Sequence, residues 1–287
     1  MFSTGNGQEG EEVAKRMRRL YHCKNGVVDG SDFWVSDSAL PRRGKAKAST
    51  ARKQEANRNQ AAHILARKLN NNFEQGDLFL TLTWEDRAWR QLRSDAYTTL
   101  AKGSRAKKEE KRDAIFFQAE KEGKRFLRRI RESGAKDLKY FIMASDMDGR
   151  TGDPARVHVH VIISGEQVTQ ARKELRICGR TLEEFWSFGK VEYESLRGGS
   201  YSVLAAYLIR QARDIKNHKK YVCSRNLEPC EYEEIELDAN AQPLTAPAGA
   251  KVEEYQHDPT NPYGLVYIRY IEPEQRKAPN RGGRRNE

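Results

Sequence analysis

The sequence predicts an α+β fold in which a central antiparallel sheet has helices packed on one side. First, short runs rich in β-forming residues alternate with longer segments of helical periodicity. Second, two of these runs are joined by a turn rich in Gly, Pro and Asp over 146–156, which is typical of an antiparallel hairpin. Third, 287 residues with 37% hydrophobic side chains leave room for one domain of ordinary size plus polar extensions.

The first elements follow from local patterns. Residues 1–50 are polar and basic, and we expect them to form a mobile arm or an irregular lead-in. A helix is predicted over 50–69, because apolar residues such as Leu65 and Leu69 recur at helical spacing. Residues 77–84 are short, apolar and rich in β-formers, which predicts a strand.

The next segments form the centre of the predicted domain. A helix is expected over 107–132, where Phe116 and Phe126 belong to an apolar stripe. Strands are expected over 138–144 and 157–161, on either side of the hairpin turn. The polar face of the helix holds six cations: Lys121, Lys124, Arg125, Arg128, Arg129 and Arg131.

The last third of the chain is predicted in less detail. We expect helices over 167–187 and 202–215, strands over 189–193, 219–227 and 263–271, an acidic patch over 228–236, a linker over 238–250 and a basic tail. The predicted organisation is a basic arm (1–50), a catalytic domain (51–237) and an extension with a linker, a strand and the tail (238–287).

The charge of the chain favours a polyanionic partner, most often nucleic acid. It has 52 Lys and Arg against 41 Asp and Glu, a net charge of +11, and an isoelectric point of about 9.4. The N-terminus lacks the apolar core of a signal peptide and no run of 18 apolar residues occurs, so we expect a cytoplasmic protein without a membrane partner. The four cysteines include no CxxC pair, which argues against a zinc ribbon and a disulfide framework.

The residues most indicative of chemistry are His158 and His160, inside the run VHVHV. Side chains of a strand alternate between faces, so both imidazoles point to one face and the valines to the other. We expect the valines to pack inward and the histidine face to meet solvent. Two adjacent imidazoles can hold a divalent metal that keeps open coordination positions. The alternative is a pair of solvated histidines without a ligand, and the basic surroundings favour the metal site.

Three motifs resemble those of rolling-circle replication initiators of the HUH superfamily. Residues 79–84 (FLTLTW) look like their first motif, 156–162 (RVHVHVI) like their paired-histidine motif, and 206–210 (AYLIR) like their helix-borne tyrosine. The resemblance covers about 50–235 and departs from the pattern twice. Arg210 stands in place of a lysine, and Ser145-Asp146 in place of a glutamate. Smaller flanking matches resemble the replication-associated proteins of bacterial plasmids and phage-like elements: 71–73, 76–77, Trp186, Gly189 and 224–229.

The resemblance implies an HUH, split ferredoxin-like fold and an enzyme that nicks and rejoins single-stranded DNA. Tyr207 would attack the DNA and form a 5′-phosphotyrosine, with Arg210 one turn away to hold the phosphate. Tyr201 is the rival nucleophile.

The metal would be Mg²⁺ or Mn²⁺, because the expected ligands mix nitrogen and oxygen. His158 and His160 would bind it together with a carboxylate. Asp146 is the first choice because it directly follows a strand expected to pair with the histidine strand, and Asp148 and Asp153 are the alternatives.

The expected partner is single-stranded DNA at a replication origin, whose phosphates would be bound by Lys121, Lys124, Arg125, Arg128, Arg129 and Arg225. A host polymerase would extend the free 3′ end. A host helicase would also be needed, because the sequence has no Gly-x-x-x-x-Gly-Lys-Ser/Thr run. The alternatives are a non-catalytic binding protein for single-stranded nucleic acid, a hydrolase of small phosphorylated substrates, or an HUH relaxase or transposase.

Overall fold

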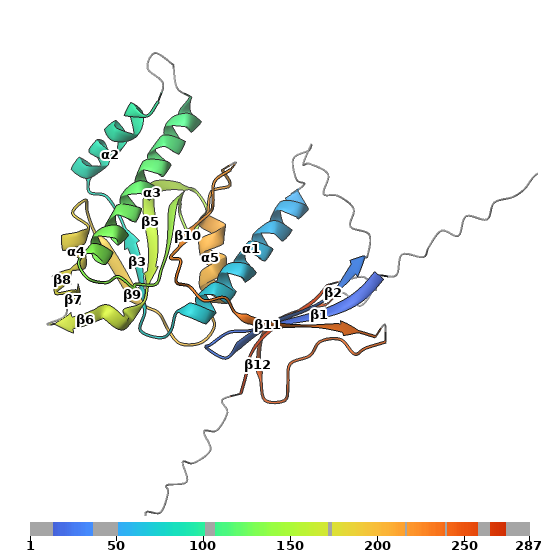
Figure 1. Cartoon of the computed structure of the whole chain (residues 1–287). Helices are drawn as coiled ribbons and strands as arrows, with labels where there is room; N and C mark the ends of the chain where they lie inside the picture. Colours follow the sequence, from blue (N-terminus) through green and yellow to red (C-terminus); the bar gives the residue numbers. More distant parts are fainter. Residues whose placement is uncertain are drawn as a thin grey trace, which may run out of the picture. The chain divides into compact units, whose positions relative to one another are not determined.

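The chain folds into two compact units (Figure 1), Met1–Ala46 with Cys230–Glu287, and Lys47–Pro229. The computed structural model describes residues 14–36, 51–100, 107–171, 174–215, 217–238, 240–257 and 265–273. The structure is mixed α+β with antiparallel sheets, which confirms the predicted class. Among the described residues, no helix is long and apolar enough to cross a membrane.

The unit Lys47–Pro229 is built on a five-stranded antiparallel sheet. Three predicted strands form its centre, because their β-forming residues pair directly in register, with Thr81 opposite His160 and His160 opposite Met143. The strands in spatial order are β10 (Val222–Cys223), β4 (Tyr140–Met147), β5 (Pro154–Ile163), β3 (Leu78–Leu82) and β9 (Val191–Ser195).

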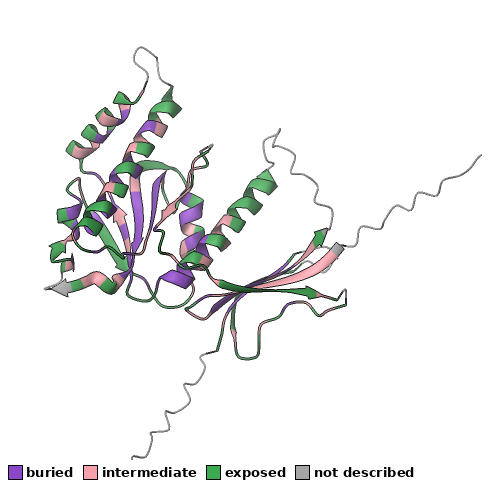
Figure 2. Ribbon diagram, viewed as in Figure 1, coloured by how far each residue is buried: buried purple, intermediate pink, exposed green. Residues whose placement is uncertain are grey.

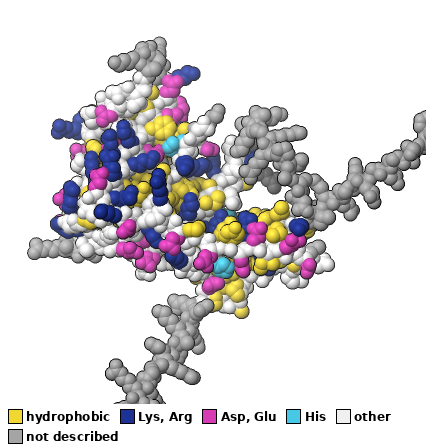
Figure 3. Space-filling view, in the orientation of Figure 1, with side chains coloured by type: hydrophobic (Ala, Val, Ile, Leu, Met, Phe, Trp, Pro, Cys, Tyr) yellow, Lys and Arg dark blue, Asp and Glu magenta, His cyan; other side chains and the backbone are white. Residues whose placement is uncertain are grey.

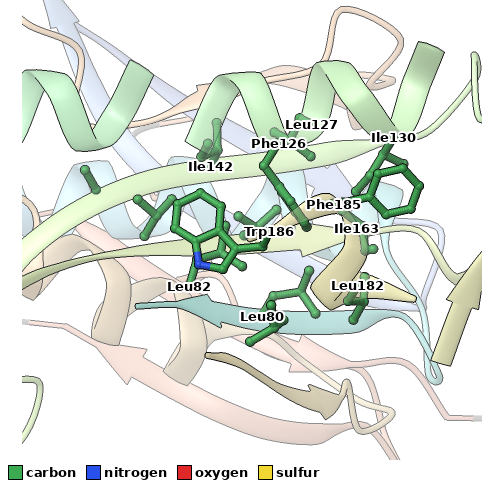
Figure 4. Packing of buried hydrophobic residues seen from close by; sticks show 14 of the residues in the cluster. Leu80, Leu82, Phe126, Leu127, Ile130, Ile142, Ile163, Leu182, Phe185 and Trp186 are labelled. Carbon is green, nitrogen blue, oxygen red and sulfur yellow. The ribbon is translucent and has the colours of Figure 1, made fainter. Parts of the chain in front are cut away.

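Helices cover both faces of this sheet, so the prediction that they pack on one side is wrong. The helix α3 (Lys108–Glu132) packs its apolar stripe on one face, and Figure 4 shows Phe126, Leu127 and Ile130 of this helix over the strands. The helices α1 (Ala51–Asn72) and α5 (Ser202–Gln211) pack on the other face, against Phe141 and Ile162. Strand β4 is apolar on both sides, and β5 adds Ile162 on the side of its histidines, so each side of the sheet needs a cover. Figure 2 accordingly shows the central strands as buried.

The segment predicted as a helix over 167–187 is mostly a small antiparallel sheet. It contains β6 (Val168–Ala171), β7 (Glu174–Ile177) and β8 (Arg180–Thr181), followed by the short helix α4 (Leu182–Phe185). Cys178 and Gly179 connect β7 to β8 with φ angles of 50° and 79°. Positive φ angles at both residues of a two-residue loop give a tight hairpin turn whose twist matches that of the flanking strands. A helix α2 (Asp86–Thr98), which was not predicted, follows β3.

The other unit is a second antiparallel sheet, in the order β11 (Glu231–Leu237), β1 (Ala14–His22), β2 (Val27–Ser36), β13 (Val266–Ile271) and β12 (Lys251–Gln256). The prediction of an irregular arm is therefore wrong for 14–36. Arg16 and Arg18, in the basic segment expected to be irregular, form ion pairs at 3.1 and 2.7 Å with the buried Asp32.

Two further expectations change with this second sheet. The acidic patch forms β11, which belongs to this unit and not to the catalytic domain predicted over 51–237. Leu244, in the predicted linker, is buried in the core with Val28 and Ile268. The predicted C-terminal strand is present as β13. The remainder of the predicted arm and the basic tail lie outside the described residues.

Candidate active site

Strand β5 carries His158 and His160 on the face that α1 and α5 cover, while Val157 and Val159 pack on the α3 side. His158 is half-buried, and His160 is only 2% exposed. The expectation of a solvent-facing histidine side therefore holds for His158 alone. His160 is enclosed because α5 and the neighbouring strand β3 cover it: Phe79 stacks on its ring at 5.3 Å and the Tyr207 ring lies 5.9 Å away.

The two imidazoles face each other through their Nε2 atoms, which are 3.1 Å apart. The Nδ1 atom of each ring is bonded elsewhere: that of His158 lies 3.1 Å from the carbonyl oxygen of Arg156, and that of His160 lies 3.2 Å from Oγ1 of Thr81. A carbonyl can only accept, so Nδ1 of His158 carries a proton, and the neutral tautomer of this ring has its lone pair on Nε2. The Thr81 hydroxyl can donate or accept, so it suits either neutral tautomer of His160. Hydrogen bonds of this kind orient histidines that bind metals.

Burial keeps His160 neutral. Burial, with a smaller contribution from the neighbouring His158, lowers the pKa of His160 to about 3, while a side-chain hydrogen bond with Gln211 acts in the opposite direction. A neutral imidazole is the form that binds a metal ion. The Thr81 and Phe79 contacts come from the segment that resembles the first initiator motif, so that segment and the paired histidines meet at one place.

Helix α5 brings Tyr207 to the histidines. The Tyr207 and His160 ring planes meet at 62°. The ring also lies against the β4–β5 turn, where a Cβ atom on Gly149 would be 2.6 Å from the Tyr207 hydroxyl oxygen. Arg210, one turn further along α5, is exposed and forms no ion pair with any residue that the structure describes.

Tyr201, the rival nucleophile, belongs to the apolar core. It is 5% exposed, precedes the first turn of α5, and packs in the cluster that includes Leu65 and Leu69 of α1. Burial, with smaller contributions from the charges of Asp77 and Glu74, raises the pKa of Tyr201 to about 12. Such a phenol is a poorer nucleophile at neutral pH than an unperturbed one.

Gln211 is a candidate site residue that the sequence did not reveal. It follows Tyr207 by one turn of α5, is 2% exposed, and influences the pKa of His160. Neither polar atom of its amide makes a hydrogen bond of good geometry in the described part of the chain. A buried amide without such partners costs free energy unless a ligand uses it. The only sequence signal is its i+4 spacing from Tyr207, which puts both on one side of the helix.

The structure does not bring Asp146 to the histidines. Its carboxylate pairs with Arg112 of α3 at 2.6 Å and lies 3.5 Å from Arg213. Because Arg112 belongs to α3, the carboxylate of Asp146 extends to the α3 face of the sheet, opposite His158. The proposed role of Asp146 as a metal ligand therefore has no geometric support.

The alternative carboxylates are turn residues. Oδ1 of Asp148 accepts hydrogen bonds from the backbone N–H groups of Arg150 and Thr151 at 2.8 and 2.9 Å, and these bonds lower its pKa. Asp153 closes the same turn through its backbone carbonyl. Within the described ranges, no group of three or more His, Cys, Asp and Glu side chains could hold a metal ion.

The residues that are present still fit a divalent cation. The Nε2 atoms of two imidazoles face one another, and the buried amide of Gln211, whose oxygen lacks a hydrogen bond of good geometry, lies beside His160. Such a set of nitrogen and oxygen donors would leave positions open for substrate oxygens.

The predicted DNA-binding cations lie mostly on α3, on the other side of the sheet from the histidines. Several are compensated: Lys124 pairs with Glu120, Arg125 with Glu122 at 2.5 Å, and Arg128 with Glu132 at 3.6 Å. Arg129 donates to the carbonyl of Phe185 at 3.1 Å. Lys121 and Arg225 are exposed, with no ion pair to a described residue. Figure 3 shows many Lys and Arg side chains on the visible face of this unit.

Comparisons of the chain with protein-family models, with curated proteins and with solved structures give no match. Its function therefore has to be inferred from the arrangement of the residues above.

Proposed function

We propose that the chain is a rolling-circle DNA replication initiator that nicks and rejoins single-stranded DNA, of the kind carried by bacterial plasmids and phage-like elements. One observation carries the proposal. The Nε2 atoms of His158 and His160 face each other at 3.1 Å, and the ring of Tyr207 lies beside the buried histidine. A candidate nucleophile, Tyr207, therefore lies next to two histidines that could hold a cation for the phosphate.

The candidate nucleophile is the hydroxyl of Tyr207. It would attack the phosphorus of the scissile phosphodiester, form a bond between the phenolic oxygen and phosphorus, and break the bond to the 3′ oxygen. The phenolic proton leaves, and the departing 3′ oxygen gains a proton. The products are a 5′-phosphotyrosine and a free 3′-hydroxyl that a host polymerase can extend. The phosphodiester energy is kept in the covalent link, so the same residue can rejoin the strand.

The groups around Tyr207 have distinct roles in this proposal. A Mg²⁺ or Mn²⁺ ion held by His158, His160 and the amide oxygen of Gln211 would neutralise charge on the phosphate oxygens. The Nδ1 hydrogen bonds to Arg156 and Thr81 hold the two imidazoles in place. Arg210, exposed on the same helix, would hold a DNA phosphate, although its planar guanidinium does so with a geometry different from that of a lysine.

The charge of the molecule supports a nucleic-acid substrate over a small phosphorylated one. The net charge is +11, and exposed cations such as Lys121 and Arg225 are available for phosphates. Unwinding of the origin would fall to a host helicase.

The test is a covalent trapping experiment. The purified protein is incubated with Mn²⁺ and a labelled pool of single-stranded DNA, and adducts that survive denaturation are separated by size. We expect an adduct with the wild type and with Tyr201→Phe, but none with Tyr207→Phe. Peptide mapping should locate the DNA on Tyr207. An adduct that persists in Tyr207→Phe, or one attached to Tyr201, would refute the assignment, and DNA binding without any adduct would favour a non-catalytic protein.

A further inference from the structure

A pocket lies in the unit Lys47–Pro229, bordered by α2, α3 and the start of β5. Its volume is about 460 Å³, within the usual range of ligand-binding pockets. Aromatic side chains of Trp89, Tyr97 and Phe116 form much of its lining. Val157 also borders it and packs in the α3 core, so the pocket lies on the α3 side of the sheet, away from the histidines.

Trp89 and Arg156 lie against each other in this pocket. The Arg156 guanidinium lies over the Trp89 ring, 4.6 Å from its centroid. It is held there by Asp86 at 3.0 Å and by the carbonyl oxygen of Glu85 at 3.3 Å. An indole and a guanidinium are both surfaces on which nucleobases stack.

The rim of the pocket is positive. Lys108 and Lys111, in the first turns of α3, border it and are exposed, and no carboxylate of the described residues pairs with either. Arg112 also borders the pocket, but its charge is compensated by Asp146 at 2.6 Å. The two lysines are thus free to bind a phosphate next to the aromatic wall.

We propose that this pocket receives an unpaired nucleobase of single-stranded DNA, stacked on Trp89, with an adjoining phosphate at Lys108 and Lys111. The inference rests on the proposed function and deepens it, because it assigns a place to a second nucleotide of the substrate strand. Arg156 connects the two sites: its carbonyl oxygen holds Nδ1 of His158, and its guanidinium lies on Trp89. A strand that passes the end of β5 would contact both.

The test compares two probes that carry the same phosphates. One is a 16-nucleotide oligothymidylate, and the other is a chain of 16 abasic deoxyribose phosphates. Binding is measured by fluorescence anisotropy with EDTA present, so that neither a metal ion nor cleavage contributes. We expect the wild type to bind the thymidylate more tightly than the abasic chain. Trp89→Leu should weaken thymidylate binding by about 5-fold to 100-fold, as loss of one stacked base does, and leave abasic binding nearly unchanged.

Two further variants control this result. Trp89→Phe keeps an aromatic ring and should retain most of the preference for bases. Arg90→Ala removes an exposed cation from the same helix, outside the pocket. It should lower the affinity for both probes equally or for neither. The proposal fails if Trp89→Leu lowers the affinity for both probes to the same extent, or if it leaves the affinity for the thymidylate unchanged. The outcome is independent of nicking: a base preference lost in Trp89→Leu without any Tyr207 adduct would uphold the pocket and refute the proposed reaction.

Discussion

The backbone of Gly149 lies directly against the ring of Tyr207. A Cβ atom on Gly149 would be 2.5 Å from Cε2 and 2.6 Å from the hydroxyl oxygen of Tyr207, closer than real Cβ contacts allow. Gly149 does not have a positive φ, so its backbone conformation suits any residue and only the contact requires glycine. The β4–β5 turn therefore fixes where the phenol can lie relative to the histidines of β5.

Gly149→Ala should displace the Tyr207 ring and slow adduct formation. A misplacement of about 1 Å at a reacting group costs about 100-fold in rate, so we expect a loss of that order in single-turnover trapping. The midpoint of thermal unfolding and the affinity for single-stranded DNA should stay close to wild type. Arg150→Lys, an exposed change in the same turn, is the matched control and should react normally. Wild-type rates in Gly149→Ala would show that this contact does not position the nucleophile.

His158→Ala should abolish binding of Mn²⁺ and formation of the adduct while leaving the fold intact. The ring is half-buried and its Nδ1 bond is to the carbonyl of the exposed Arg156, which water can satisfy after the change. Isothermal titration with Mn²⁺ measures the loss of metal binding, and covalent trapping measures the loss of the adduct. Thermal unfolding with EDTA measures whether the fold stays intact. His257→Ala, an exposed histidine of the other unit, should change neither. Retained Mn²⁺ binding or loss of folding in His158→Ala would each contradict the proposed metal site.

The centre of the unit Lys47–Pro229 was predictable from local patterns, because each of its elements has a strong period. The predicted segments 77–84, 138–144 and 157–161 correspond to β3, β4 and β5, and the long amphipathic helix corresponds to α3. The alternation in β5 also assigned both histidines to one face. The cover of that face was not predictable, because α1 and α5 are far from β5 in sequence and meet it only in the folded chain.

The errors have similar physical origins. Asp146 directly follows a predicted strand that is apolar on both faces, so its alternation did not indicate which way the carboxylate points. Its partner, Arg112, is 34 residues away. Cys178-Gly179 forms a hairpin turn in which a non-glycine residue has a positive φ, which the sequence does not signal. Gln211 carries no charge, and its significance comes from burial next to His160.

Gln211→Leu should lower the affinity for Mn²⁺ and the nicking rate without weakening the fold. Leucine removes buried amide atoms that lack hydrogen bonds of good geometry, so the free energy of unfolding should stay the same or rise. Gln211→Glu keeps an oxygen at the site and adds negative charge, and we expect it to bind Mn²⁺ at least as tightly as the wild type. Titration of both variants with Mn²⁺ decides the matter. Equal affinities for Gln211→Leu and the wild type would remove Gln211 from the metal site.

The basic face of α3 should contribute to DNA binding mainly through its uncompensated charges. Lys121 forms no ion pair with a described residue, and among the described residues Arg128 pairs only with the exposed Glu132. Arg125, in contrast, is 2.5 Å from the buried carboxylate of Glu122. Each phosphate contact with single-stranded DNA contributes about 0.7 to the slope of log affinity against log salt concentration. Neutralising Lys121 and Arg128 to Gln should therefore lower this slope by about 1.4, and Arg125→Gln should lower it less. An unchanged slope in the double variant would show that this face is only solvated.

His160 should make the stability of the fold depend on pH in a defined window. Its pKa is about 3 in the folded chain against an ordinary value of 6.5, so the unfolded chain takes up a proton first as the pH falls. Stability is therefore lost from pH 6.5 downward toward pH 3, by up to about 1.4 kcal/mol for each pH unit. Denaturant unfolding of the wild type and of His160→Gln, measured with EDTA between pH 7 and 4, tests this. Other acidic groups act on both proteins, so the difference in slope belongs to His160. If the free energies of unfolding of the wild type and of His160→Gln changed in parallel with pH, the His160 ring would be protonated in the folded state. It would then not be kept neutral for a metal ion.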